Sequence, residues 1–326
     1  MRFTRQTHRS PSRGIASLLL LVLALPALRA IASPPVEATA AGFTVNTFSS
    51  DFTAQTVDMN NTLNRGYKWY LFNLYGTKAD PAGVKINGDG SVTIEGGTTG
   101  AEGSLMTVAP YPGTNGWVGT SFGGGGYFES VMKFDPAVVT AAHKEGAGVW
   151  PAFWSLPMQG TFTSGDQWPG QPTGYQHNVE MDFFEADFWT STTIYGAGLH
   201  DWYGIPNKTC APGLCKVSMT NPSGQRNTPA GTNLNTYHTY GVLWVPATAR
   251  TEGSFSAYFD GKLIGSTLTW TQYTNQPPTP VGKSWAFGRL DQEHLFFILS
   301  SGHAVPFTLK SVNVWQRSTT ENLTNN

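Results

Sequence analysis

The chain has 326 residues, of which 40% are hydrophobic, 13% aromatic and only 13% charged, with 11 tryptophans. Five arginines and no acids lie within residues 1–32, so the formal net charge of −1 leaves the rest of the chain clearly acidic. This balance argues against nucleic acid or an anionic membrane as a partner. A weakly charged chain rich in Trp and Tyr suits sugar recognition, although most of these rings are expected to build a core.

Residues 1–32 have the pattern of a secretory signal peptide. Four arginines precede the apolar run "IASLLLLVLALPAL" (15–28), and "AIA" (30–32) supplies a small-x-small cleavage site. The apolar run is short for a membrane span and contains a proline. We therefore expect a secreted protein, extracellular or periplasmic, with no membrane attachment after cleavage. Residues 33–42, "SPPVEATAAG", are expected to form a linker.

Short strand-like runs separated by Gly, Pro and Asn fill residues 43–318. In "FESVMKF" (128–134), Phe128, Met132 and Phe134 fall on one face and Glu129 and Lys133 on the other. Asp260-Gly261 predicts a two-residue hairpin turn, and one short turn of helix can follow Asp135. The absence of a long amphipathic helix or a break in composition predicts one all-β domain, an antiparallel sandwich. Residues 319–326 are expected to be a disordered tail.

The segment "VEMDFFEAD" (179–187) places three acids in an otherwise apolar run. Glu180 and Asp182 share a strand face, whereas Glu185 has the wrong parity. One β-bulge within Phe183-Phe184 would return Glu185 to the face of the other acids. Three neighbouring carboxyl groups hold their protons unequally, and retaining glycoside hydrolysis needs one ionised and one protonated carboxyl group. A solvated strand face with ordinary acids is the alternative.

The two cysteines, Cys210 and Cys215 in "CAPGLC", lie close together in a chain expected to be exported. We predict a small loop-closing disulfide between them, not a metal or redox site.

The acidic run resembles the E-x-D-x-x-E signature of family 16 glycoside hydrolases in its bulged form. Four other segments resemble blocks of that family in the same order and cover about residues 43–318: "GGGGYFESVMKF" (123–134), "GVWPAFWSLP" (148–157), "YHTYGVLWVP" (237–246) and "AYFDGKLIGS" (257–266). The resemblance implies a jelly-roll sandwich, concanavalin-like, with a concave substrate cleft. It also implies that Glu180 is the nucleophile, Glu185 the acid/base and Asp182 a helper of Glu180.

The same resemblance suggests substrate-binding residues. Trp150 and Trp154 are four apart, share a face on a strand, and match family positions in the sugar cleft. His200 follows the acids where the family often has a His beside the acid/base, and Trp202 lies two residues further along. The turn-rich stretch 161–178 should form one wall of the cleft. Core packing of the tryptophans and a structural His200 are the alternatives.

We therefore expect a monomeric, secreted, retaining endo-glycosidase acting on β-linked glucan, either β-1,3 or mixed β-1,3/1,4. A non-catalytic lectin-like sandwich, a transglycosylase and a galactan hydrolase of the same family remain alternatives. No cofactor is expected. The family resemblance allows a structural calcium, but no loop in the sequence has a recognisable calcium-ligand pattern.

Overall fold

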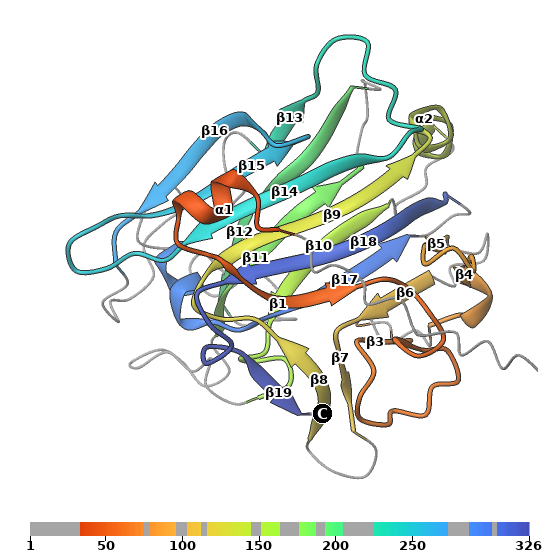
Figure 1. Ribbon diagram of the computed structural model, residues 1–326, viewed down its shortest axis with the longest axis horizontal. Coiled ribbons are helices and arrows are strands. Elements are labelled where there is room, and N and C mark those ends of the chain that lie inside the picture. The colour runs from red at the N-terminus through yellow and green to blue at the C-terminus, as the bar shows by residue number, and fades with distance from the viewer. Residues whose placement is uncertain are drawn as a thin grey trace, which may run out of the picture. The chain divides into compact units, whose positions relative to one another are not determined.

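The computed structural model describes residues 33–72, 74, 79–95, 103–111, 116–144, 151–163, 176–186, 193–204, 224–272, 287–301 and 305–325. Residues 33–326 form one compact unit. Two eight-stranded sheets are stacked as layers, and a three-stranded sheet flanks them (Figure 1). This is the antiparallel jelly-roll sandwich that the sequence predicts. The predicted signal peptide, residues 1–32, lies outside the described residues.

Sheet A contains, in spatial order, β16 (Lys262–Trp270), β15 (Gly253–Phe259), β14 (His238–Val245), β9 (Gly126–Phe134), β18 (Phe307–Gln316), β5 (Val92–Ile94) and β4 (Val84–Ile86), and β1 (Val45–Ser50) pairs with β18. Sheet B contains β13 (Gln225–Asn227), β12 (Ile194–Gly204), β11 (Gln176–Glu185), β10 (Ala152–Pro157), β17 (Leu295–Ser301), β6 (Gly103–Met106), β3 (Trp69–Tyr70) and β2 (Val57–Asp58). The small sheet contains β19 (Leu323–Asn325), β8 (Trp117–Ser121) and β7 (Val108–Pro110). The helices are α1 (Val36–Ala40), α2 (Pro136–Lys144), and the 3₁₀ turns η1 (Pro81–Gly83) and η2 (Gly288–Gln292).

The main core lies between the two sheets and is rich in aromatic rings. Phe128 of sheet A contacts Phe183 and Phe297 of sheet B, with ring centroids 5.4 and 5.6 Å apart. The predicted alternation along β9 is confirmed, since Phe128, Met132 and Phe134 all point into this core. Burial of such side chains contributes about 1.5–3 kcal/mol each, so the two layers are held together chiefly by this contact.

Two local predictions are confirmed. Asp260 and Gly261 have φ values of 48° and 70° and connect β15 to β16 as a two-residue hairpin, in which Phe259 pairs with Lys262. Only the left-handed region gives the backbone twist of this turn, which is why an Asp-Gly pair occupies it. Helix α2 follows Asp135 as expected, although its nine residues make more than the single predicted turn. Asp135 Oδ1 accepts a hydrogen bond from the Ala137 N–H at 2.9 Å and caps the helix.

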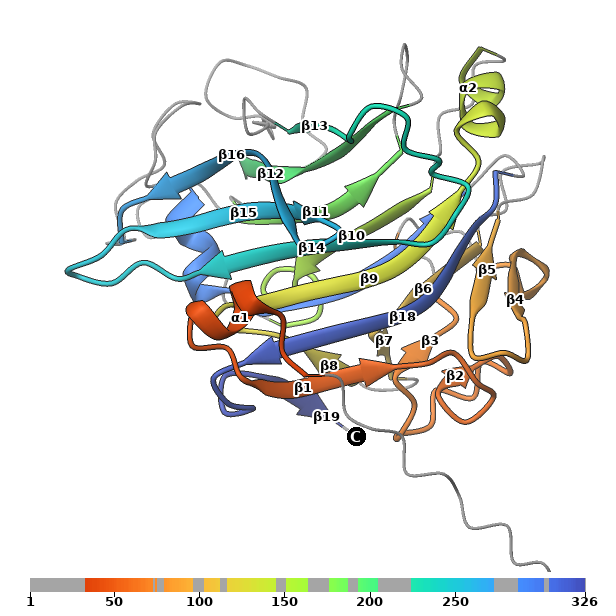
Figure 2. The same ribbon diagram turned by 45° about the horizontal axis from the view of Figure 1, so that its top comes forward.

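The structure differs from the sequence expectation at the N-terminal segment. Residues 33–42 are not a simple linker, because α1 lies on the outer face of sheet A beside β9 (Figure 2). Ala38 and Phe43 are buried there against Tyr127 and Trp315. The segment "SPPVEATAAG" is rich in Pro, Ala and Gly, which is typical of a linker, but it and the next residue supply two apolar side chains that cover an aromatic patch.

The C-terminal segment also differs from the expected disordered tail. Within 319–325, β19 pairs with the free edge of β8, with Leu323 opposite Ser121. Leu323 packs against a second apolar cluster that includes Met106 and Trp154. A single apolar residue and an unpaired neighbouring edge are enough to order a segment that is otherwise polar.

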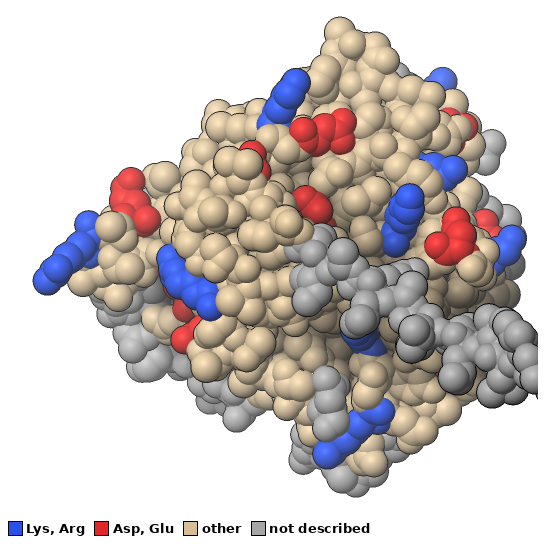
Figure 3. Space-filling model, in the orientation of Figure 1, with Lys and Arg blue, Asp and Glu red and all other residues tan. Residues whose placement is uncertain are grey.

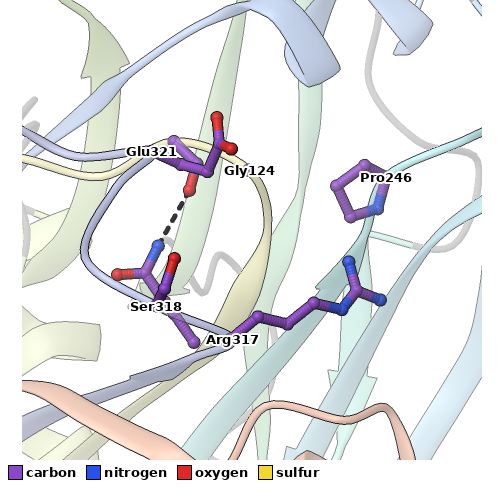
Figure 4. A pocket seen from close by; sticks show the side chains of 7 residues that line it. Gly124, Pro246, Arg317, Ser318 and Glu321 are labelled. Carbon is purple, nitrogen blue, oxygen red and sulfur yellow. Dashed lines mark hydrogen bonds between the residues drawn. The ribbon is translucent and has the colours of Figure 1, made fainter.

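The glycine run 123–126 makes a close turn before β9. Gly124 and Gly125 have φ values of 70° and 79°, and a Cβ on Gly124 would lie 2.5 Å from the Glu321 side chain. This turn lines a pocket of about 460 Å³ with Pro246, Arg317, Ser318 and Glu321 (Figure 4). The Gln316 Nε2 donates to the Gly123 carbonyl at 2.8 Å and ties the turn to β18.

Charged side chains are sparse on the face formed by sheet A. Lys and Arg are interspersed with Asp and Glu, and no single-sign patch dominates this view (Figure 3). None of the helices within the described ranges is long and apolar enough to cross a membrane.

Candidate active site

A β-bulge interrupts β11 at the predicted position. On the β10 side, Phe153 pairs with Phe184 and the next residue, Trp154, pairs with Asp182, so Phe183 has no partner of its own in this register. The β12 side shows the same shift between Asp182 and Glu185. Both phenylalanines are buried in the core. The extra residue is therefore accommodated inward, and the strand regains its alternation one position later.

The bulge places the three acids on one face. Glu180, Asp182 and Glu185 lie opposite His200, Gly198 and Gly196 of β12, which are themselves two residues apart. Residues directly opposite in an antiparallel pair share a face, so all three acids project outward from sheet B. The two glycines add no side chain there. Glu180 and Glu185 are half-buried, and Asp182 is buried at 1% exposure.

Two side chains of β12 contact the acids directly. The Trp202 Nε1–H donates to Glu180 Oε2 at 2.7 Å. The His200 Nε2 lies 2.8 Å from Asp182 Oδ2, and the His200 and Trp202 rings are stacked at 6.2 Å between centroids. The family pattern suggests a His beside the acid/base, but here the imidazole is bonded to Asp182, because the register sets His200 opposite Glu180 and away from Glu185.

The pKa of Glu180 is raised from its ordinary value of 4.5 to about 8. Burial is the main cause, and the negative charge of Asp182 and a hydrogen bond with it raise the pKa further. His200 and the indole N–H of Trp202 act in the opposite direction and favour ionised Glu180. Two carboxyl groups this close titrate as a unit, so the Glu180–Asp182 pair retains a proton near neutral pH.

Replacing Trp202 by Phe should shift the titration of Glu180 to higher pH. The variant keeps an aromatic ring but loses the N–H that stabilises the carboxylate. A hydrogen bond to a charged group contributes about 1.5–3 kcal/mol, and one pKa unit is about 1.4 kcal/mol, so we expect a shift of about one to two units. Carbon-13 NMR of the Glu180 carboxyl group measures it directly. An unchanged titration would show that the indole does not stabilise the ionised form.

A cleft of about 660 Å³ opens beside Glu180 and Trp202. Asn178 and Thr161 add polar groups to its wall. Apolar side chains make up most of the remaining wall: Phe72, Leu74, Pro110, Leu156 and Phe162. Thr161 and Phe162 at the start of the predicted wall segment 161–178 and Asn178 at its end all line the cleft, and Gly160 directly precedes the segment. Trp168 and Tyr175, the aromatic residues of the same segment that are expected to line the wall, lie outside the described residues.

Trp154 lies on the carboxylate face, directly opposite Asp182. Its Nε1–H donates to the Ser300 Oγ at 3.1 Å, and its side chain packs with the apolar cluster beneath the cleft. Only 6% of the residue is exposed. Stacking of Trp154 on a sugar therefore stays a prediction. Trp150, Cys210 and Cys215 lie outside the described residues, and the predicted disulfide with them.

Within the part of the chain that the structure describes, Glu180, Asp182 and His200 form a group that could hold a metal ion. One ligand atom of each lies within 4.8 Å of the others. A divalent cation bound there would occupy the same carboxylates that the proposed chemistry needs, so it would compete with a reaction at Glu180.

Several residues behind the acids were not identified from sequence. His177 and Asp201 are fully buried, with Nε2 and Oδ1 2.5 Å apart, on the inner face of β11 and β12. Arg289 and Glu293 are buried beside them. Strand parity places residues 177 and 179 on the inner face, so a His at 177 was the one available signal of a buried polar group.

The chain is similar in fold to several solved structures. The kappa-carrageenase from Pseudoalteromonas carrageenovora, in complex with an oligotetrasaccharide of kappa-carrageenan, shares 14% identity over 73% of this chain and 83% of that chain, with a TM-score of 0.41. An endo-1,3-beta-glucanase from Streptomyces sioyaensis shares 20% identity over 91% of this chain and 100% of that chain, with a TM-score of 0.44. The globular domain of T. cruzi calreticulin shares 9% identity over 83% and 88% of the respective chains, with a TM-score of 0.40. No family model and no curated protein matches the chain.

Proposed function

We propose that the chain is a secreted, retaining endo-glycosidase that hydrolyses β-linked glucan of the β-1,3 or mixed β-1,3/1,4 type. The observation that carries this proposal is the bulge at Phe183, which sets Glu180, Asp182 and Glu185 on one face beside a cleft. The match of these acids to the family 16 signature supports the same reaction. The proposed secretion rests on the signal-peptide pattern of residues 1–32.

In the first step, Glu185 acts as the acid. Its carboxyl proton passes to the glycosidic oxygen while the Glu180 carboxylate attacks the anomeric carbon. The bond between that carbon and the leaving oxygen breaks, and an ester joins the sugar to Glu180. A retaining site requires the two carboxyl groups to be about 5–5.5 Å apart. Four strand steps separate Glu180 and Glu185 along β12, about 13 Å at Cα, so both side chains must lean toward the scissile bond.

In the second step, the Glu185 carboxylate removes a proton from water, which attacks the anomeric carbon and releases Glu180. The configuration at that carbon is inverted twice and so retained. Glu180 must be ionised when it attacks, since only the ionised carboxylate is a nucleophile. Trp202 favours the ionised form, because its N–H donates to the attacking carboxylate.

A substrate panel with product analysis tests the proposal. Purified protein is incubated with laminarin, lichenan, agarose and kappa-carrageenan, and the first products are followed by proton NMR and chromatography. We expect internal cleavage of laminarin or lichenan, with β-anomers formed first. Binding without product would indicate a lectin-like function. Products longer than the donor would indicate transglycosylation, and cleavage of agarose or carrageenan alone would indicate a galactan hydrolase.

A further inference from the structure

The edge of β11 that faces β10 changes its partner just before Glu180. The paired register with β10 ends where Ser155 lies opposite Met181. β10 continues to Pro157 paired only with β17, which lies along its other edge from Ala152 onward, and the Met158 N–H donates to the His294 carbonyl. The backbone groups of residues 177–179 on this edge must therefore be satisfied by something other than β10, because buried backbone N–H and C=O groups are nearly always paired.

Two side chains from η2 and the residue after it form hydrogen bonds with this edge of β11, where β10 no longer pairs with it. The Val179 N–H donates to Glu293 Oε2 at 3.1 Å, and the Arg289 Nε–H donates to the His177 carbonyl at 3.4 Å. Because residues two apart direct their backbone groups to the same edge of a strand, the His177 carbonyl and the Val179 N–H lie on one edge of β11, and both are hydrogen-bonded there. Arg289 and Glu293 also face each other at 3.5 Å, and both are buried.

We propose that Arg289 and Glu293 are positioning residues that hold the backbone on which Glu180 stands. A buried ion pair is a poor device for stability alone, because well-packed apolar residues often do as well or better. Apolar residues could not bond the amide and carbonyl of β11, however. Residue 179 immediately precedes Glu180, so a shift of this edge moves the nucleophile directly. The catalytic part of this inference rests on the proposed function.

The test compares Glu293→Ala with Asp291→Ala. Asp291 lies on η2, and its Oδ2 accepts from the Ala247 N–H, just after β14, at 2.9 Å. Its carboxylate also accepts from the indole N–H groups of Trp244 and Trp270, so it binds sheet A and makes no contact of this kind with β11. A displacement of about 1 Å can reduce catalysis 100-fold. At a temperature at which both variants are folded, we expect Glu293→Ala to lower kcat on laminarin about 10- to 100-fold, with KM within about twofold. Asp291→Ala should leave kcat near that of the unchanged protein.

Glu293→Gln is the rescue variant, because the Gln side-chain carbonyl can still accept from Val179; its kcat should stay close to that of the unchanged protein. Equal kcat in the two Ala variants, or a Gln variant as slow as Glu293→Ala, would overturn the proposal. Two measurements need no glycan hydrolysis. The Val179 amide should exchange with solvent as slowly as paired amides of β11 in the unchanged protein, and Glu293→Gln should preserve this protection. The backbone amide NMR shift of Glu180 should change in Glu293→Ala and not in Asp291→Ala.

If the unchanged protein hydrolyses no glycan, the proposed function fails, while amide exchange at Val179 and the amide NMR shift of Glu180 still decide the positioning. If Glu293→Ala does not fold, exchange at Val179 in the unchanged protein and in Glu293→Gln decides it alone. Rapid exchange of this amide in the folded protein would show that Glu293 does not hold the Val179 N–H, and would overturn the proposal.

Discussion

Glu180→Gln is expected to lower hydrolysis of laminarin or lichenan by roughly 10⁴-fold or more, the scale on which removal of a nucleophile acts. Gln has the same shape, and its carbonyl can still accept from the Trp202 N–H. The binding of glucan oligosaccharides should therefore persist, as measured by calorimetry. Turnover equal to that of the unchanged protein would rule out Glu180 as the nucleophile and, with it, the proposed chemistry.

The effect of Glu180→Gln on the stability of the fold has a definite direction, which provides a control for folding. The pKa of Glu180 is raised to about 8 by burial in the folded protein, while the unfolded chain loses this proton near the ordinary value. Between these two pH values the unfolded state binds fewer protons, so ionisation of this group destabilises the fold as pH rises. Gln cannot ionise. At pH 8, Glu180→Gln should therefore unfold at a temperature equal to or above that of the unchanged protein, and the difference should shrink toward pH 5.

Glu185→Gln is expected to lower kcat on a natural glucan by about 10²–10⁴-fold, because the leaving oxygen no longer receives a proton. An aryl glycoside with an acidic phenol needs little protonation, so the first step with that substrate should be far less affected. Added azide should then accelerate turnover and yield a β-glycosyl azide, since the sugar is still first transferred to Glu180.

The matched comparison is Glu180→Ala with azide, which should give the α-glycosyl azide by a single displacement. This pair of variants decides the roles sharply, because the raised pKa of Glu180 would also suit a proton donor. An α-azide from the Glu185 variant and a β-azide from the Glu180 variant would exchange the two assignments.

The bulge could be predicted because parity is a local property. Glu180 and Asp182 have one parity and Glu185 the other, and only an extra residue between them reconciles three acids with one polar face. The paired phenylalanines supply that residue and a hydrophobic reason for turning it inward. The hairpin at Asp260 and the alternation of β9 are local in the same sense.

The contacts of the acids could not be predicted in this way. Whether Trp202 stacks on a sugar or donates to Glu180 depends on the register of β11 against β12. Strand parity fixes the face on which each side chain lies, but a shift of the register by two residues would keep the same faces. Arg289 and Glu293 are more than 100 positions from β11, in a short turn without a periodic pattern. The order of segments 33–42 and 319–325 could not be predicted, because it comes from surfaces supplied by distant strands.

The segment that carries α1 lies on sheet A, whereas the acids and the cleft belong to the outward side of sheet B. A carrier protein or a surface linker joined ahead of Ser33 would thus be attached at the back of the molecule. Immobilised by that end, the protein would present the three acids and the cleft away from the support, open to long or insoluble polymers.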